Sequence, residues 1–341
     1  MKKNKLIIIV VLLLSATALY FFISYSNGTI KRELRDFAVK DTTSINKIFI
    51  ADRKGNKSLL ERKPGRAGWT VNGKYDARPD AIKTLLGTIR AIEVRSPVAK
   101  AGYNTVLKML ASDGTKIEIY SDNELIKTYY VGGPTEDFLG TFMYLENSTV
   151  PFVIHIPGFD GYLSTRYFAK EGEWRSPIIF GYGENQIARV IAKDFLDSSK
   201  SFKVEKQGNE YKFYTPFNNA QPSQVYQSQI AAYLAKYQLI AYEWVAADMK
   251  KHVKDSILQS PPLRYLEVTD VNGKTTRMTM YRKPVAEGTL SSTDPTTGEL
   301  RAYDYDRLYS TLNNDTNLLG IQYFVFDKLF KKPNEIKGFG S

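Results

Sequence analysis

Apolar and polar positions alternate in short stretches along much of the chain, a pattern typical of half-buried β-strands. Two longer segments, residues 78–92 and 221–237, instead have apolar positions at helical spacing, and each has a proline near its start. Runs of antiparallel strands with one helix packed on each sheet indicate an α+β fold. The strands predicted in this way are residues 45–50, 107–111, 116–120, 125–131, 263–268 and 276–281.

The pattern of the first half returns in the second half. Residues 45–50 are answered 142 positions later, and both Ser58 and Pro79 have counterparts 143 positions later, at Ser201 and Pro222. Farther on, the turn at residues 112–114 matches residues 271–273 at an offset of 159. We therefore predict two similar units, with an insertion in the second one near residues 243–259.

The N-terminus determines the expected location. Residues 6–23 (LIIIVVLLLSATALYFFI) are 18 uncharged positions that follow Lys2, Lys3 and Lys5. This length just allows a helix to cross a bilayer core, and the basic head favours a cytoplasmic amino terminus. We expect a single-pass anchor in the inner membrane, with the body of the protein in the periplasm. A cleaved signal peptide is the alternative, since Ala-Thr-Ala at residues 16–18 fits a cleavage site. A buried helix of a soluble protein is a third possibility.

The anchor and two units divide the chain into three parts. Ile30, Leu34 and Phe37 recur at helical spacing and predict a short juxtamembrane helix. Residues 1–44 are thus assigned to the cytoplasmic head, the transmembrane helix and this juxtamembrane helix. The first α+β unit is expected at residues 45–182, and the second at residues 183–341.

Composition removes several kinds of chemistry. The 341 residues include no cysteine, which excludes disulfides, zinc–thiolate sites, iron–sulfur clusters and thiol catalysis. There are only two histidines, His155 and His252, so a multi-histidine metal site is excluded as well. The net charge of +11 comes from basic residues scattered among acidic ones, which we interpret as a solvated surface and not as a nucleic-acid interface. No metal ion or cofactor is predicted.

Several motifs in the first half resemble a known family. They are the strand beginning Ile45-x-x-Ile48, Ser58-Leu59-Leu60-Glu61-Arg62, Gly68-Trp69-Thr70-Val71, the helix within residues 76–92, and Val131-Gly132-Gly133. Together they resemble the family called domain of unknown function 4340, over residues 45–168 and again over residues 187–330. The N-terminal anchor and the high tyrosine content are similar to members from Bacteroidota. The resemblance implies an accessory role in the cell envelope, since some relatives are encoded near transporter-like ATPase modules associated with gliding motility. It supplies no catalytic residues.

Catalytic motifs are matched only superficially. Residues 44–47 fit S-x-x-K and residues 121–123 fit S-D-N of penicillin-recognising enzymes, but K-T-G is absent. Ser44 would open a strand, which points Lys47 to the opposite face, and residues 121–123 read as a turn. Asp304 and Asp306 form a D-x-D pair of the kind that can hold a divalent ion, and we interpret this pair as solvated. No catalytic residue is predicted.

The leading functional hypothesis is a non-enzymatic, membrane-anchored binding or scaffold protein, accessory to an envelope or ABC-transporter-like complex. A groove between the two units is expected to hold a partner segment or a glycan. The alternative is an enzyme that modifies envelope polymers through carboxylates that no motif identifies. The aromatic-rich tail is either core packing or a docking patch, because aromatic residues are enriched in interface cores. The candidate partner-binding residues are Trp244, Lys250 and Lys251 in the predicted insertion, and Tyr303, Tyr305 and Arg307 in the tail.

Overall fold

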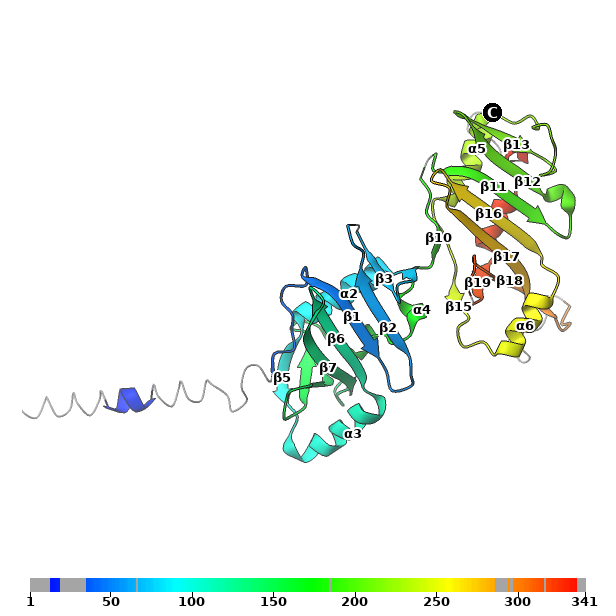
Figure 1. The fold of residues 1–341 in the computed structure, drawn as a ribbon. Helices are drawn as coiled ribbons and strands as arrows, with labels where there is room; N and C mark the ends of the chain where they lie inside the picture. The colour runs from blue at the N-terminus through cyan, green and yellow to red at the C-terminus, as the bar shows by residue number, and fades with distance from the viewer. Residues whose placement is uncertain are drawn as a thin grey trace, which may run out of the picture. The chain divides into compact units, whose positions relative to one another are not determined.

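The computed structural model describes residues 13–18, 35–65, 67–183, 185–285, 294, 297–315 and 317–335, and it divides the chain into two compact units, Met1–Ser176 and Pro177–Ser341 (Figure 1). Each unit combines helices with an antiparallel sheet, which confirms the α+β prediction. The predicted anchor lies outside the described residues except for residues 13–18, which are helical. No helix in the described ranges is both long enough and apolar enough to cross a membrane.

The first unit contains a nine-stranded sheet in the order β4-β3-β2-β1-β6-β7-β8-β9-β5. All neighbouring strands are antiparallel, and β1 and β6 lie near the centre of the sheet. The strands are β1 (Ile45–Ala51), β2 (Lys57–Arg62), β3 (Trp69–Val71), β4 (Tyr75–Asp76), β5 (Glu93–Pro97), β6 (Thr115–Ser121), β7 (Glu124–Pro134), β8 (Thr141–Leu145) and β9 (Phe152–His155).

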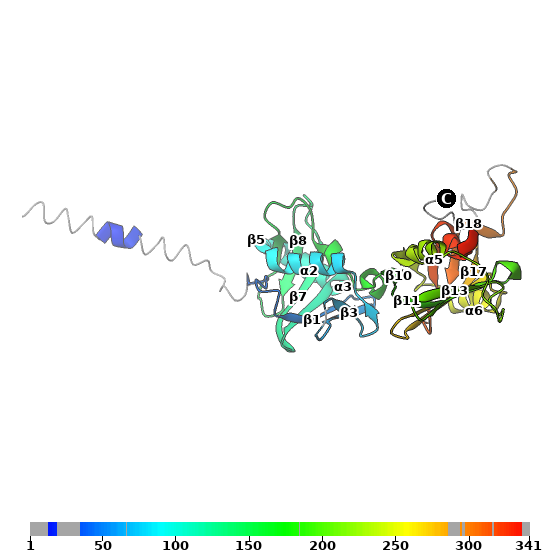
Figure 2. The ribbon, with the colours of Figure 1, turned by 90° about the horizontal axis from the view of Figure 1, so that it is seen from above.

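Two helices cover opposite faces of this sheet. The helix α2 (Pro79–Ala91) starts at a proline, whose missing N–H costs nothing in the first turn, and it buries Ile82, Leu85 and Ile89 in the main core (Figure 2). The helix α3 (Tyr103–Asp113) buries Val106 and Leu110 against side chains of β7 and β8 that alternate with the main-core ones and therefore lie on the other face. A third, short helix is α4 (Glu171–Trp174).

The second unit contains an eight-stranded sheet in the order β13-β12-β11-β16-β17-β18-β19-β15. Its first strand pair, β10 with β14, stands apart from this sheet, and this pairing places residues 178–180 in the second unit. The elements are β10 (Ile178–Phe180), β11 (Ile187–Asp194), β12 (Phe202–Gln207), β13 (Glu210–Tyr214), α5 (Gln227–Leu234), β14 (Ile240–Ala241), β15 (Trp244–Val245), α6 (Lys251–Gln259), β16 (Arg264–Asp270), β17 (Thr275–Pro284), β18 (Tyr303–Ser310), β19 (Leu319–Gln322) and α7 (Tyr323–Phe326).

The two sheets have the same strand order once β4 is set aside, because β11, β12, β13, β15 and β16–β19 take the places of β1, β2, β3, β5 and β6–β9. Irregularities in the strand register recur at matching points. The pairing of β1 with β6 shifts between Ile45 and Lys47, and that of β11 with β16 shifts 142 positions later, between Ile187 and Arg189. The helix α5 and the 3₁₀ turn that continues it (Ala235–Tyr237) occupy the place of α2, and their core residues Ile230, Tyr233 and Tyr237 follow those of α2 by 148 positions.

The prediction of one helix per unit was wrong, because each unit has a second helix of comparable length, α3 or α6. Residues 107–111, predicted as a strand, lie inside α3. Over so few residues the apolar positions fit both periods, and the burial of Val106 and Leu110 shows that the helical period applies. Gly114 does not form a hairpin turn but ends this helix. Its backbone lies so close to the last turn that a Cβ atom there would be 2.2 Å from the Leu110 carbonyl oxygen, which explains the glycine.

Residues 243–259 are not an insertion, since β15 and α6 are the counterparts of β5 and α3. The matched hairpin turn of the first unit is at Asp122 and Asn123, both with positive φ, and not at residues 112–114. The additional chain of the second unit instead joins β13 to α5, residues 215–226, and β17 to β18, residues 285–302. The prediction that Pro222 opens a helix was wrong, because Ser223 beside it forms an extended bridge with Phe213 and α5 begins only at Gln227.

The folded part of the first unit starts earlier than Ile45. Phe37 is 2% exposed and packs edge-on against Phe152, with ring centroids 5.7 Å apart. Residues 36–39 have no helical backbone, so Phe37 does not extend a juxtamembrane helix. The rest of that predicted helix, including Ile30 and Leu34, lies outside the described residues.

Candidate functional site

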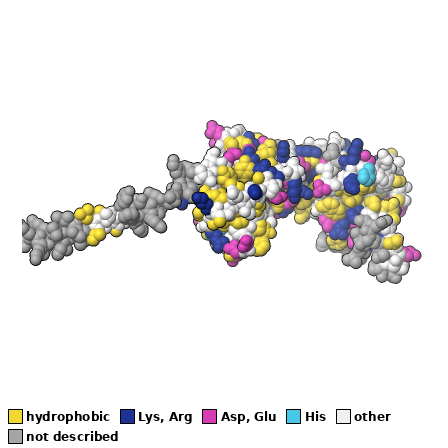
Figure 3. All heavy atoms as spheres, turned by 90° about the horizontal axis from the view of Figure 1, so that it is seen from below, with side chains coloured by type: hydrophobic (Ala, Val, Ile, Leu, Met, Phe, Trp, Pro, Cys, Tyr) yellow, Lys and Arg dark blue, Asp and Glu magenta, His cyan; other side chains and the backbone are white. Residues whose placement is uncertain are grey.

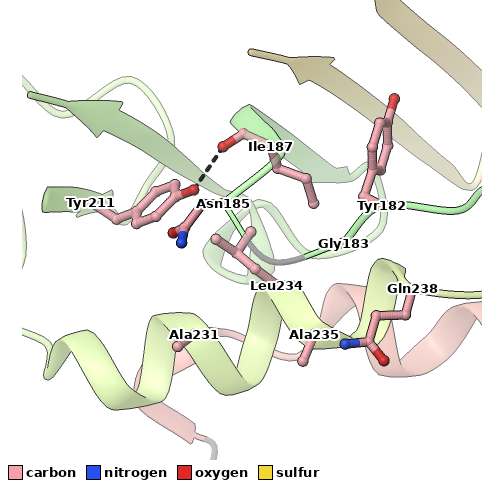
Figure 4. Close-up of a pocket in the computed structure, with 9 residues that line it drawn as sticks. All are labelled: Tyr182, Gly183, Asn185, Ile187, Tyr211, Ala231, Leu234, Ala235 and Gln238. Atoms are coloured by element: carbon pink, nitrogen blue, oxygen red, sulfur yellow. Dashed lines mark hydrogen bonds between the residues drawn. The ribbon is translucent and has the colours of Figure 1, made fainter. Parts of the chain in front are cut away.

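A cavity of about 270 Å³ opens in the second unit between α5 and the sheet, and we call it the α5 cavity (Figure 4). Its helix wall follows from the amphipathic pattern of α5. Ile230, Tyr233 and Tyr237 point into the core and are fully buried, which leaves the neighbouring flank of the helix for the cavity. Ala231 and Ala235, one turn apart on this flank, carry only methyl groups and leave the space open.

Tyr211 on β13 forms the strand wall of the α5 cavity. Its hydroxyl donates a 2.8 Å hydrogen bond to the carbonyl oxygen of Ile187 (Figure 4). Burial raises the pKa of Tyr211, so the phenol stays protonated and remains a donor. The Gln227 side chain binds both backbone groups of Tyr211, accepting from its N–H at 3.1 Å and donating to its carbonyl at 2.8 Å. The first residue of α5 thereby fixes the sheet-edge strand that carries Tyr211.

The polar groups that line the α5 cavity are amides and phenols. Asn185 and Gln238 offer side-chain amides, whereas the Tyr182 phenol, whose pKa is raised by burial, points away from α5 (Figure 4). Among the lining residues that the structure describes, none carries a charged side chain. This arrangement suits a neutral polar ligand, held by hydrogen bonds against the apolar flank of Leu234.

The first unit has a cavity of about 390 Å³ at the corresponding place, and we call it the α2 cavity. Its helix wall follows the same positions of α2, which precede those of α5 by 148 residues. Its strand wall is Trp69, at the register position of Tyr211, since Trp69 pairs with Arg62 as Tyr211 pairs with Lys206. The corresponding pairs on the helices are Lys83 and Ala231, Leu86 and Leu234, Gly87 and Ala235, and Arg90 and Gln238.

Beside each cavity, the backbone carbonyl group at the equivalent position accepts a hydrogen bond from a different kind of side chain. Ile45, which corresponds to Ile187, accepts from Arg62 Nε at 3.1 Å. The Arg62 guanidinium also lies over the Trp69 ring, 5.0 Å from its centroid. An indole has no hydroxyl to offer, so the arginine on the neighbouring strand supplies the donor that Tyr211 supplies in the second unit.

The predicted tail residues share one face of β18. Tyr303 and Tyr305 are 45% and 58% exposed and line a separate cavity of about 420 Å³. Arg307 follows at the next alternate position and forms a bidentate ion pair with Glu243, with N–O distances of 2.8 and 2.9 Å. This pair raises the pKa of Arg307 and lowers that of Glu243.

Trp244 lies beside this row of β18, whereas Lys250 and Lys251 belong to the start of α6. Trp244, on β15, covers the backbone of Gly320 and packs against the Tyr309 ring, so it is part of the sheet's outer packing. Lys250 and Lys251 are exposed at the start of α6. The structure thus places Tyr303, Tyr305, Arg307 and Trp244 along one face of the sheet, and the two lysines at the start of α6.

The two motifs to which the sequence analysis gave no catalytic role, the D-x-D pair and residues 121–123, have structural roles. The interpretation of Asp304 as solvated was wrong, because Asp304 is buried, pairs with Lys283 at 2.8 Å and accepts hydrogen bonds from the backbone N–H groups of Asp306 and Arg307. Asp304 therefore orders its own strand. Within the described residues, no three histidine or carboxylate side chains lie close enough to hold a metal ion. Ser121–Asn123 form the predicted turn.

Sequence reasoning missed both cavities, because alanine, leucine and glutamine at helical spacing match no functional motif. Aligning the two helices at an offset of 148, instead of 143, would have shown that Lys83 and Arg90 correspond to Ala231 and Gln238. Lys and Arg side chains are scattered over both units on the face drawn in Figure 3, with Asp and Glu among them. Comparison of the chain with protein families, curated proteins and solved structures finds no match.

Proposed function

We propose that the chain is a binding or scaffold protein, anchored in the inner membrane by residues 6–23, with its two units in the periplasm. It would act as an accessory of an envelope or transporter complex, in line with the family resemblance of its sequence. The apolar run behind a basic head supports the anchor and its orientation. The repeated topology supports an origin by internal duplication, which places two binding modules on one chain.

The observation that carries this proposal is the recurrence of one cavity in both units. Both cavities are walled by the same flank of the first long helix and by an aromatic residue, Trp69 or Tyr211, at the same register position. Pockets with an apolar wall and a few convergent polar groups are the usual form of ligand sites. The two cavities thus have the same location in the two units, but their linings differ in charge. This is expected for two copies that recognise different ligands.

The carboxylates of the described residues support binding over catalysis. Each such carboxyl group with a shifted pKa has that pKa lowered by hydrogen bonds and ion pairs, so none of these groups is tuned to act as a general acid. Glu267 is the most instructive case, since it is only 8% exposed. Burial would raise its pKa, but hydrogen bonds from Tyr265 and Arg277 and the charge of Arg189 outweigh burial. It is held as a paired anion.

In-cell photo-crosslinking of the full chain tests the proposal. A photoreactive phenylalanine analogue is placed at Gln238, which lines the α5 cavity, or at Tyr305, in the predicted docking patch. The matched controls are Leu239, adjacent to Gln238 and 67% exposed, and Tyr226, 77% exposed. We expect adducts of defined mass at Gln238 and Tyr305 after purification from membranes in mild detergent, and none at the controls.

Two results would count against the proposal. Equal labelling at Leu239 and Tyr226 would show only non-specific encounters, and a lack of adducts at all four positions would remove the case for a ligand. If the purified full chain turns over an envelope polymer, the envelope-polymer enzyme takes the place of the binding protein.

A further inference from the structure

The α2 cavity combines an apolar interior with a cationic rim. Trp69, Ile82 and Leu86 supply the apolar lining, and Lys83 and Arg90 stand seven positions apart on the exposed side of α2. Its volume of about 390 Å³ lies within the range of roughly 300–1,000 Å³ that is typical of small-molecule sites. The α5 cavity has the same shape of wall but carries Ala231 and Gln238 at the two cationic positions.

The cations of the rim are available to a ligand. Among the described residues, no carboxylate forms an ion pair with Lys83 or with the Arg90 guanidinium. Asp80, the acidic residue nearest to Lys83 on the same helix, is held by Arg78 at an exposed ion pair. A ligand anion placed between Lys83 and Arg90 would therefore meet two cations that no described side chain neutralises.

The chain that follows the apolar run is attached beside this rim. Val39 donates its backbone N–H to Ile89 at 3.1 Å, and Lys40 Nζ lies 3.4 Å from the Arg90 carbonyl oxygen. Thr42, two positions farther, lines the cavity itself. Only 19 positions separate Thr42 from Ile23, the last residue of the apolar run. An extended chain of that length reaches at most about 65 Å, so the cavity stays within that distance of any membrane that the run enters.

We propose that the α2 cavity binds an anionic amphiphile, with its acidic head on Lys83 and Arg90 and its apolar body against Trp69 and Leu86. The proposal deepens the proposed function, because it names a ligand class for the first unit. The chemistry is shared by an anionic phospholipid and by a free single-chain acid. A neutral amphiphile lacks the group that the rim recognises, and inorganic phosphate lacks the part that the apolar lining recognises.

Native mass spectrometry of the full chain in a neutral detergent tests this directly. The probes are phosphatidylglycerol, dodecyl phosphate, diacylglycerol and inorganic phosphate. We expect one saturable adduct with each of the first two and none with the others. Preference for phosphatidylglycerol over dodecyl phosphate identifies a membrane lipid as the source, and the reverse identifies a free amphiphile.

Exchanging the rim residues between the two copies makes the test specific. Lys83→Ala with Arg90→Gln gives the first unit the residues of the second, and removing two cations should weaken binding about 30-fold. The control Lys57→Gln with Lys108→Ala removes the same charge from exposed positions outside the cavity and should bind like the unchanged chain.

The reverse exchange is a test of gained binding. Ala231→Lys with Gln238→Arg places the cationic rim on the α5 cavity and should raise the stoichiometry from one adduct to two. Retained binding in the Lys83→Ala, Arg90→Gln variant, or equal binding of diacylglycerol, overturns the assignment. Saturable binding of inorganic phosphate alone overturns the amphiphile. None of these outcomes alters crosslinking at Gln238 or Tyr305, so the proposed function stands or falls separately.

Discussion

A substitution at Gly320 tests whether Trp244 stabilises the sheet by packing on it or is instead a contact residue for a binding partner. Trp244 pairs with Gly320 on the neighbouring strand, and Gly320 in turn pairs with Tyr309. Because glycine has no side chain, the indole lies across its backbone and meets the Tyr309 ring at 6.3 Å between centroids, with an interplanar angle of 73°. A Cβ at Gly320 would lie 2.2 Å from Cε2 of the indole and 2.3 Å from Cδ2 and Cη2.

These distances set the expected magnitude. Carbon atoms make favourable contacts at roughly 3.5–4.0 Å, so the indole of Trp244 must move by more than about 1 Å in a Gly320→Ala protein. The backbone of Gly320 is not at positive φ, so the methyl group itself is the cause of any loss. Overpacking of this kind costs about 1–3 kcal/mol, and we expect the upper half of that range because a ring cannot bend aside as a flexible side chain can.

The assay is urea unfolding of the full chain followed by circular dichroism, with hydrogen exchange to assign the loss to β15, β18 and β19. Gly133→Ala is the matched control, since its Cβ would make an ordinary 3.5 Å contact with Met109 Sδ. In a chain that already carries Trp244→Ala, Gly320→Ala should cost almost nothing, giving a coupling energy of about 2 kcal/mol. Additive losses, or a neutral Gly320→Ala, would refute the packing argument and return Trp244 to the list of partner contacts.

Three further predictions concern other parts of the chain. Tyr211→Phe leaves the Ile187 carbonyl without its donor and should lower the free energy of unfolding by about 1–3 kcal/mol in the same urea assay. The pKa of Asp304 is lowered, because Lys283 and two backbone amides outweigh the effect of burial. The stability from this pair should be complete above the unfolded-state value of about 4 and lost as the pH falls through the lowered folded-state pKa, and Asp304→Asn should remove this part of an acid titration. A reporter that is active only in the periplasm, fused after Ser341, should be active, and activity of a cytoplasmic reporter instead would contradict the orientation.

The sequence by itself determined most of the local structure. Alternating positions identified β1, β6, β7, β16 and β17, since burial of one sheet face leaves a period of two in the chain. The stripe of Ile82, Leu85 and Ile89 identified α2 for the same reason at the helical period. The offset of 142 also pointed to the shared topology of the two units. These features depend on which face of an element is buried. That face can be identified from the sequence, because buried positions are apolar and exposed positions are polar.

The tertiary structure decided what depends on contacts between distant residues. The apolar positions of residues 107–111 fit the strand period and the helix period equally well. Only the packing of Val106 and Leu110 against the outer faces of β7 and β8 shows that the segment is helical. The extra chain of the second unit could be located only once β15 and α6 were paired with β5 and α3 in strand order. The two cavities likewise depend on register, which places Trp69 and Tyr211 at the same position of two equivalent sheets, each opposite the equivalent positions of its own helix. Hydrophobic periodicity reports whether a side chain is buried, but which residue it meets across the sheet follows only from strand order and register.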